Sequence, residues 1–434
     1  MSDTSDLEYK NSLNLKIASR DNYGRVVTRS KIPIEVKPPI FQSFTHIEVS
    51  SKLFRLSGCI IPGFDPLKDR KKDCQDDYGI FENPSSFLVA LFDGHGTNGH
   101  IVSKFCKDYM ESYYLSNSSQ FEDSPKSSID TMIQSCDTSL KQSPIDTFLS
   151  GTTAVVLYLN SQGIHVGSVG DSRAILATIP KILNEPNPAI KSTNRYTRSI
   201  VPTRKLQAIA LTIDQKPNHS QELKRIQNSG GEVRRIADEL GNPLGPYRVW
   251  VKGGKTPGLG MSRAIGDKVA ASIGVIPTPI LNSFKIYSDL DQFFVIASDG
   301  IWDVMENIEV INFVEKFRGL ACSRQLTQEF PAKLSNSTIA RLLCEEARYR
   351  WFGILENEDV CVDDISCVII EITNIDSAVN LIGAKNENRQ ANEVFNSMAV
   401  EGVVDVKRDR AARNDPTRGS TADIGIEFLA EALR

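Results

Sequence analysis

The stretch 87-FLVALFDGHG-96 decides the fold of this chain. Six apolar residues run without interruption into Asp93-Gly94-His95-Gly96. A short apolar run that ends at Asp and Gly is typical of a buried strand that finishes in a turn. Asp93 is therefore expected at the end of an interior strand, on the rim of a sheet.

Other aspartates repeat this arrangement. Each lies where an apolar run meets a turn: Asp171 after residues 164–170, Asp299 after 293–298 with Asp303 close behind, and Asp363 before 365–372. One such Asp is ordinary turn chemistry, but several at strand ends predict a shared carboxylate cluster. Clustered carboxylates repel one another unless a cation neutralises them, and hard divalent ions prefer oxygen ligands. The sequence therefore predicts a metal enzyme.

Each aspartate also has a simpler explanation. Asp93-Gly94 is a common hairpin turn, and Asp299 suits the start of a helix. Asp171 could pair with Arg173 in its own turn, and Asp363 with Asp364 could be an acidic entry to a strand. We expect a helix over 301–317. Asp299 and Asp303 are four residues apart across its start, so both carboxylates can face one site. We favour the cluster because the simpler explanations must all hold at once.

The composition is that of a soluble globular protein. The 434 residues are 40% hydrophobic and 24% charged, with a net charge of −4, which gives no support for a nucleic-acid partner. No apolar stretch approaches the roughly 20 residues of a membrane span. The polar start and the scattered cysteines favour a reduced compartment, the cytoplasm or nucleus, and we expect a monomer.

The pattern of apolar residues divides the chain into three parts. We expect an N-terminal arm over 1–52, a catalytic domain over 53–373, and a C-terminal appendage over 374–434, where charges replace the apolar pattern. Within the middle part we expect amphipathic helices over 101–115 and 127–141, a hairpin over 152–170, a surface insertion over 178–206 and a short helix over 220–231.

Eight segments, in this order along roughly 55–373, resemble the protein phosphatase 2C family of metal-dependent Ser/Thr phosphatases. They are CQDDYGI (74–80), LFDGHGTNGH (91–100), SGTTAVV (150–156), VGSVGDSRAIL (166–176), LTIDQKPNHSQELKRIQNSGGEV (211–233), RVWVKGGKTPGLGMSRAIGD (248–267), VIASDGIWDVM (295–305) and DDISCVII (363–370). The resemblance implies an α+β fold, a four-layer αββα sandwich in which helices flank a central antiparallel β-sandwich. Residues 234–258 would form the family's flap beside the site.

The resemblance also implies roles for single residues. Asp93 would bridge two Mn²⁺ or Mg²⁺ ions, and the Gly94 carbonyl would bind one of them. His95 would be the general acid that protonates the departing Ser or Thr oxygen of the phosphoprotein substrate, while water activated by the two ions attacks phosphorus. The remaining ligand positions are Asp299 and Asp363 at the first ion, Asp76 at the second, and Asp171 and Asp303 at a third, weaker ion, where they also help to place the acid.

Two departures from the family's commoner pattern bear on function. Gln75 stands where many members have Glu, and a neutral amide is expected to weaken metal binding. Lys71, with Arg70 beside it, stands at the usual phosphate-binding Arg, and Lys lacks the bidentate fork of Arg. The expected function is a protein Ser/Thr phosphatase. The alternative is a catalytically weak pseudophosphatase that binds phosphoproteins without turnover.

Overall fold

A computed structural model describes residues 12–15, 18–20, 26–28, 32–35, 41–49, 52–64, 73–180, 205–238, 240–322, 339–355 and 361–374. The chain forms two compact units. Residues 1–15, 32–36 and 374–434 make up one, of which β1 (Ser12–Leu15) and β4 (Ile32–Glu35) are described as an antiparallel pair. Residues 16–31 and 37–373 make up the other, which carries the candidate site.

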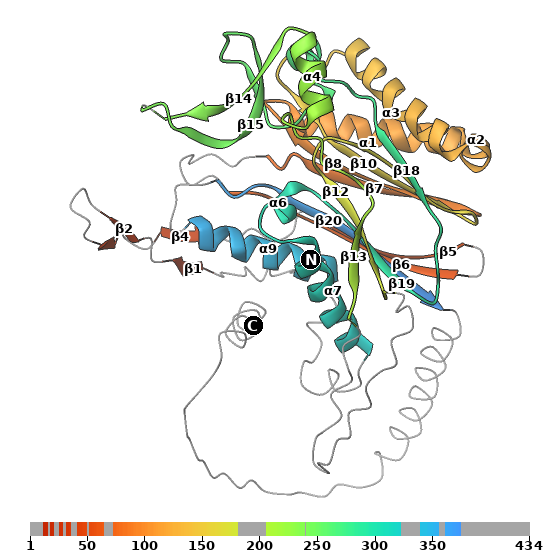
Figure 1. Ribbon diagram of the computed structural model, residues 1–434. Helices are drawn as coiled ribbons and strands as arrows, with labels where there is room; N and C mark the ends of the chain where they lie inside the picture. The colour runs from red at the N-terminus through yellow and green to blue at the C-terminus, as the bar shows by residue number, and fades with distance from the viewer. Residues whose placement is uncertain are drawn as a thin grey trace, which may run out of the picture. The chain divides into compact units, whose positions relative to one another are not determined.

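Two antiparallel sheets form the centre of the larger unit (Figure 1). The first has seven strands in the order β17-β9-β8-β10-β11-β18, with β7 on the free edge of β8. Its strands are β7 (Asp76–Asn83), β8 (Ser86–His95), β9 (Gly151–Thr152), β10 (Ala154–Asn160), β11 (Gly163–Val169), β17 (Ile265–Gly266) and β18 (Ile280–Phe284).

The second sheet has six strands in the order β13-β12-β19-β20-β6-β5. They are β5 (Phe41–Val49), β6 (Lys52–Ile61), β12 (Arg173–Thr178), β13 (Gln207–Ala210), β19 (Asp291–Ala297) and β20 (Ile365–Asn374). Strand β5 falls inside the expected arm over 1–52, yet it pairs with β6 along its whole length, from Phe41↔Ile60 to Val49↔Lys52. The three-part division by residue number stays a prediction.

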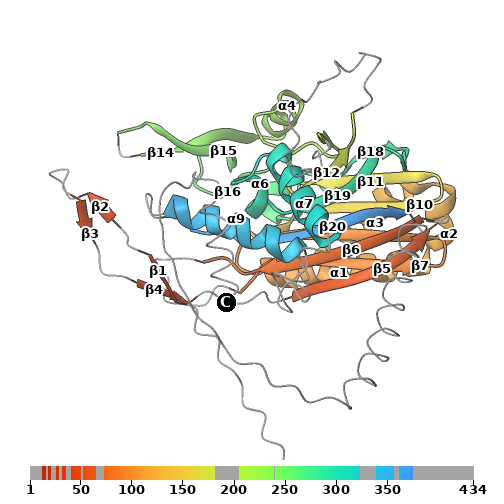
Figure 2. The same ribbon diagram turned by 90° about the horizontal axis from the view of Figure 1, so that it is seen from below.

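Helices cover the outer face of each sheet (Figure 1). The seven-stranded sheet is covered by α1 (Gly99–Ser116), α2 (Ser118–Asp123) and α3 (Pro125–Gln142), and the six-stranded sheet by α6 (Asp299–Trp302), α7 (Asn307–Cys322) and α9 (Ile339–Leu355). The view from below in Figure 2 shows α7 and α9 over the strands of the six-stranded sheet. The remaining elements are α4 (Ser220–Asn228), α5 (Lys268–Ala271), a sheet of β14 (Gly231–Ala237), β15 (Pro243–Val251) and β16 (Pro257–Leu259), and the pair β2 (Ala18–Arg20) and β3 (Val26–Thr28).

Three apolar layers hold these four layers of structure together. Side chains such as Leu91, Leu157 and Ile296 fill the space between the sheets. A second cluster joins the six-stranded sheet to α7 and α9, and a third joins the seven-stranded sheet to α1–α3. Successive strand residues point to opposite faces, so a strand that is apolar throughout is one buried on both sides. The expected αββα sandwich is confirmed.

The predicted hairpin and amphipathic helices are also confirmed, as β10 with β11, α1 and α3. The prediction of a single helix over 301–317 is wrong in one respect, because the structure has two helices there. Asp303 ends α6 as its C-cap, and α7 begins at Asn307. The Glu309 carboxylate accepts the main-chain N–H of Glu306 at 2.9 Å, which caps the second helix separately. Most of the insertion over 178–206 lies outside the described residues.

Candidate metal centre and acid

The aspartates come from the same end of both sheets. Asp76 begins β7 and Asp93 lies near the end of β8, and the two are direct partners across the antiparallel pair. In the other sheet Asp171 precedes β12, Asp299 follows β19 and Asp363 precedes β20. Since β19 runs antiparallel to both neighbours, these three strand ends also coincide. The register therefore brings five strand-end aspartates to one edge of the sandwich.

Electrostatic coupling shows that these carboxyl groups are close together. The pKa of Asp93 is raised well above its usual range, first by burial and then by the charges of Asp299, Asp76, Asp363 and Asp171. Burial and the charges of Asp171, Asp363 and Asp303 do the same to the pKa of Asp299. Such repulsion is what a bound cation relieves.

Asp76 is the carboxylate best suited to an ion. Burial, followed by the charge of Asp364, raises its pKa to about 8, and these effects outweigh the opposing influence of the Ser366 and Ser298 hydroxyls. Within the described residues neither of its carboxylate oxygens has a partner that meets hydrogen-bond distance and angle, although both are buried. A buried carboxylate without such partners is costly unless a cation binds it. Asp76 therefore fits a metal ligand.

The carboxylates do not form a finished cage as they stand. Within the ranges that the structure describes, no group of three or more His, Cys, Asp or Glu side chains has the mutual arrangement of a metal site. Lys216 also contacts Asp171, with its Nζ 2.6 Å from Oδ2, while Oδ1 of Asp171 is buried and has no hydrogen-bond partner among the described residues. Ion binding would require the carboxylates to turn toward one another, and an ion at Asp171 would compete with Lys216.

The Gly94 position is fixed by packing. Its main-chain N–H donates to the Gln75 carbonyl at 3.1 Å, and a Cβ at position 94 would lie 2.6 Å from that carbonyl oxygen. The N–H of Thr153 donates to the Asp93 carbonyl at 2.9 Å, and the Asp93 N–H donates to the Thr153 hydroxyl at 3.0 Å. That hydroxyl lies 2.7 Å from the Ser172 hydroxyl beside Asp171. These contacts connect the ends of the two sheets.

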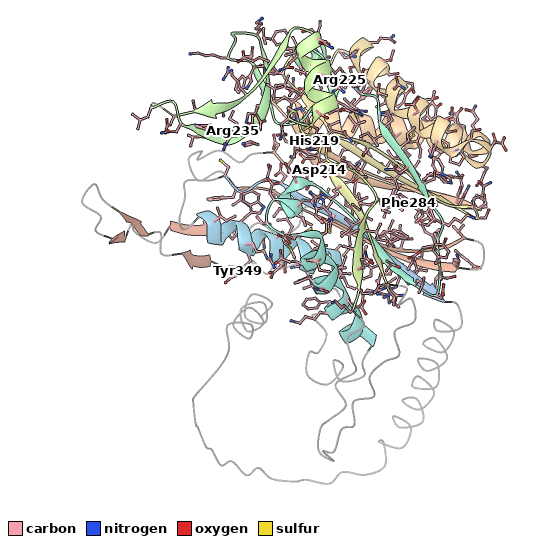
Figure 3. The ribbon with its side chains drawn as sticks, in the orientation of Figure 1. Asp214, His219, Arg225, Arg235, Phe284 and Tyr349 are labelled. Atoms are coloured by element: carbon pink, nitrogen blue, oxygen red, sulfur yellow. The ribbon has the colours of Figure 1, made fainter. Side chains whose placement is uncertain are left out.

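The simple turn interpretation of Asp171 is wrong. Arg173 does not pair with Asp171 but binds Asp214 through two nitrogens, at 2.9 and 2.7 Å, and donates to Asn307 at 2.6 Å. Asp214 is labelled in Figure 3. The carboxylate of Asp171 is therefore left to face the acidic cluster and Lys216.

Gln75 has a structural contact that the sequence did not reveal. Its side-chain amide donates to the carbonyl of Gly96 at 2.6 Å, and its main-chain N–H donates to Asp364 at 2.9 Å. Asp364 also accepts the N–H of Gly63 at 2.6 Å, so this buried carboxylate ties three segments together. A Glu at position 75 could not donate to Gly96. The amide thus steadies the Asp93–Gly96 turn as well as removing a charge.

His95 lies at the end of β8 and contacts a residue that the sequence analysis did not single out. Its Nε2 is 2.7 Å from Oδ2 of Asp267, and its Nδ1 is buried without a hydrogen-bond partner in the described part of the chain. Burial alone lowers the pKa of His95, but the Asp267 carboxylate and the more distant Asp171 and Asp363 outweigh it, so that the pKa is raised. The imidazole is therefore held in its protonated form more readily than a free one. Arg70 and Lys71 lie outside the described residues.

Comparison with known proteins identifies the family of this chain. The family model described as protein phosphatase 2C matches residues 63–350. The chain belongs to the protein phosphatase 2C family. A relative named "Probable protein phosphatase 2C 41" from Arabidopsis thaliana is 31% identical over 82% of this chain and 93% of its own length.

Two further comparisons show how far the similarity to known proteins extends. "Probable protein phosphatase 2C 12" from Oryza sativa is 32% identical over 52% of this chain, and the match spans 63% of that protein, less than two thirds of its length. The solved serine-threonine phosphatase 2C from Toxoplasma gondii has a TM-score of 0.54 and 17% identity, covering 76% of this chain and 99% of that one. This second likeness is one of fold. None of the helices described here has the length and apolar character needed to cross a membrane.

Proposed function

We propose that this protein is a metal-dependent phosphatase that hydrolyses phosphoserine and phosphothreonine in proteins. The observation that carries the proposal is the convergence of aspartates from both sheets beside His95. Family membership supports the same chemistry, and the relatives' names support protein phosphatase activity. The phosphoprotein that it acts on, a monomeric state, and a cytoplasmic or nuclear location stay predictions.

The acidic residues fit two hard divalent ions, Mn²⁺ or Mg²⁺, because they offer only oxygen ligands and include a buried carboxylate, that of Asp76, with no hydrogen-bond partner in the described part of the chain. Asp93, the Gly94 carbonyl, Asp76, Asp299 and Asp363 would hold these ions. When bound, the ions would supply a water-derived nucleophile at neutral pH and neutralise charge on the phosphoryl oxygens. Asp171 and Asp303 would hold a third, weaker ion once Lys216 moved aside.

The protein's own groups complete the reaction. His95 holds a proton at the end of β8, where it can donate to the oxygen that leaves phosphorus. Alkoxide oxygens are poor leaving groups, so this proton matters for phosphoserine and phosphothreonine. Arg70 and Lys71 would attract the phosphate as positive charges.

Turnover with and without metal tests the proposal. We expect hydrolysis of a phosphothreonine peptide with Mn²⁺, no hydrolysis in EDTA, and recovery when Mn²⁺ is restored. Asp299→Asn should remove most activity without unfolding the protein. Retention of full turnover in chelator would contradict the mechanism. A chain that binds the phosphopeptide with Mn²⁺ but never hydrolyses it would instead be the pseudophosphatase.

A further inference from the structure

The contact between His95 and Asp267 joins residues 172 positions apart in the sequence. The Asp267 side chain is only 3% exposed, and its Oδ2 lies 2.7 Å from the imidazole Nε2. The other ring nitrogen, Nδ1, is buried and makes no hydrogen bond to the described residues. A carboxylate that accepts a hydrogen bond at one ring nitrogen determines which nitrogen is free to exchange its proton.

Helix capping does not explain Asp267. It is the N-cap of α5 (Lys268–Ala271), the position where Asp ordinarily bonds the helix's own N–H groups, but its side chain makes no such bond. Its φ of 45° is the one positive value among the non-glycine residues that the structure describes. A left-handed residue costs conformational energy and persists only where its surroundings require it.

The surrounding backbone fixes Asp267 in this conformation. Its N–H donates to the carbonyl of Ser150 at 2.9 Å, and its carbonyl accepts from Ala271 at 2.8 Å. Strand β9 lies between His95 and Asp267. Its Gly151 is paired with His95 on one side and with Gly266, the neighbour of Asp267, on the other. A Cβ at Gly151 would overlap Oδ2 of Asp267. Glycine at this position is what lets the carboxylate reach across the strand to the ring.

We propose that Asp267 is a positioning residue that orients His95 and fixes its tautomer, leaving Nδ1 as the atom that delivers the proton. This inference rests on the proposed phosphatase function. The bond from phosphorus to the substrate oxygen breaks as a bond from phosphorus to a water oxygen forms. The leaving oxygen takes the Nδ1 proton, and the attacking water releases a proton to solvent. The ring is then neutral, with its Nε2–H still hydrogen-bonded to Asp267, until solvent reprotonates Nδ1.

Two substitutions at Asp267 separate its carboxylate from its backbone. Asp267→Asn keeps the shape and the tolerance for a left-handed backbone but loses the charge. Asp267→Gly removes the side chain altogether, and because glycine adopts a φ of 45° without strain, the variant should keep the native backbone. For both variants we expect kcat on a phosphoserine peptide to fall about 10- to 100-fold, within or below the usual range for loss of acid catalysis, with KM nearly unchanged. On p-nitrophenyl phosphate, whose leaving group hardly needs a proton, the loss should be within about threefold.

Coupling and a spectroscopic readout make the test specific. Adding Asp267→Asn to His95→Gln should cost nothing further on the phosphopeptide, because the two residues act as one unit. At a pH where the His95 ring of the metal-free wild type is neutral, its ¹⁵N resonances should report a proton on Nε2, and Asp267→Gly should shift this tautomer preference. Asp137→Asn is the matched control, since this buried carboxylate on α3 accepts the N–H of Gly266, the residue before Asp267, at 3.0 Å. It should lower stability but leave the ratio of the two substrates unchanged.

Each remaining outcome overturns a distinct claim. Wild-type activity on both substrates in an Asp267→Gly variant would show that only the backbone at 267 matters. Equal losses on both substrates would place Asp267 outside the acid step. An inactive wild type with Mn²⁺ would overturn the proposed function, and the positioning role with it.

Discussion

Gln75 shows how one side chain can serve both the electrostatics and the geometry of the site. Its amide adds no charge beside Asp76 and donates to the Gly96 carbonyl at 2.6 Å. A Glu at this position would lose that bond and add a carboxylate to an already crowded acidic cluster. The protein without metal should therefore tolerate Gln at this position better than the family's commoner Glu.

We predict that Gln75→Glu destabilises the metal-free protein by about 0.5–1.5 kcal/mol, the net contribution of one hydrogen bond, because the bond to Gly96 lies where water can reach it. Mn²⁺ should offset the added charge, so the rise in Tm between EDTA and Mn²⁺ should be larger than in the wild type. Differential scanning fluorimetry in both conditions measures this rise. Gln75→Met, which loses the donor but gains no charge, is the control and should show a wild-type rise. Identical Tm values for Gln75→Glu and wild type in EDTA would separate this side chain from the cluster.

Helix α4 is tied to the loop before Asp267 by one buried carboxylate. Glu222 binds Arg263 at 2.7 Å and Arg225 at 2.7 Å, and accepts from the Ser262 hydroxyl at 2.7 Å; Arg225 is labelled on α4 in Figure 3. Burial alone raises the pKa of Glu222, but these donors outweigh burial and lower the pKa to about 2. The ionised Glu222 carboxylate and its donors therefore stabilise the fold fully above the ordinary pKa near 4.5. This stabilisation is lost as the pH falls through about 2.

We predict that Glu222→Gln lowers the free energy of unfolding at pH 7 by about 3 kcal/mol, because two guanidinium groups lose their partner. The difference from wild type should stay constant down to about pH 4.5 and then shrink toward pH 2. Urea denaturation across this pH series measures it. The control is Glu232→Gln, which removes the partner of Arg234. This ion pair is more exposed than that of Glu222, so stability should change by less than about 1 kcal/mol at every pH. A difference that grew on acidification would contradict the pairing.

Elements were predictable from the sequence where one local signal sufficed. The run 87–92 is apolar on both faces, so Asp93 could end only an interior strand. The break between α6 and α7 was missed because Glu306 and Glu309 look like ordinary helical residues until their capping bond is seen. Asp267 was missed for a different reason. An Asp before a short helix is typically a cap, and its true partner is distant in the sequence.

At the scale of the whole molecule, the acidic cluster belongs to both sheets. Asp76 and Asp93 lie on the seven-stranded sheet, while Asp171, Asp299 and Asp363 flank strands of the six-stranded sheet. The sequence predicted the convergence of these residues, but not that their carboxylates lack the arrangement of a finished metal site. That arrangement depends on side-chain rotations, which strand positions do not fix.

We predict that Mn²⁺ raises the Tm of the wild type, because ion binding at a hundredfold excess over Kd adds roughly 2.7 kcal/mol to the free energy of unfolding. Asp76→Asn and Asp299→Asn each remove a carboxylate from a different sheet. Both should lose most of this rise, while in EDTA neither should be less stable than wild type, because each relieves repulsion. Thermal melts with a Mn²⁺ titration measure both effects. A variant that kept the full rise would show that ions bind to one sheet alone.

The distribution of the aspartates along the chain also sets the order of events in folding. No contiguous half of the chain contains both Asp76 and Asp363, and β20, which follows Asp363, lies inside the six-stranded sheet between β19 and β6. During synthesis the cluster cannot exist until that late segment has been made and inserted. An ion that needs carboxylates from both sheets could therefore bind only after the apolar layers had brought the sheets together, and its uptake would report a completed sandwich.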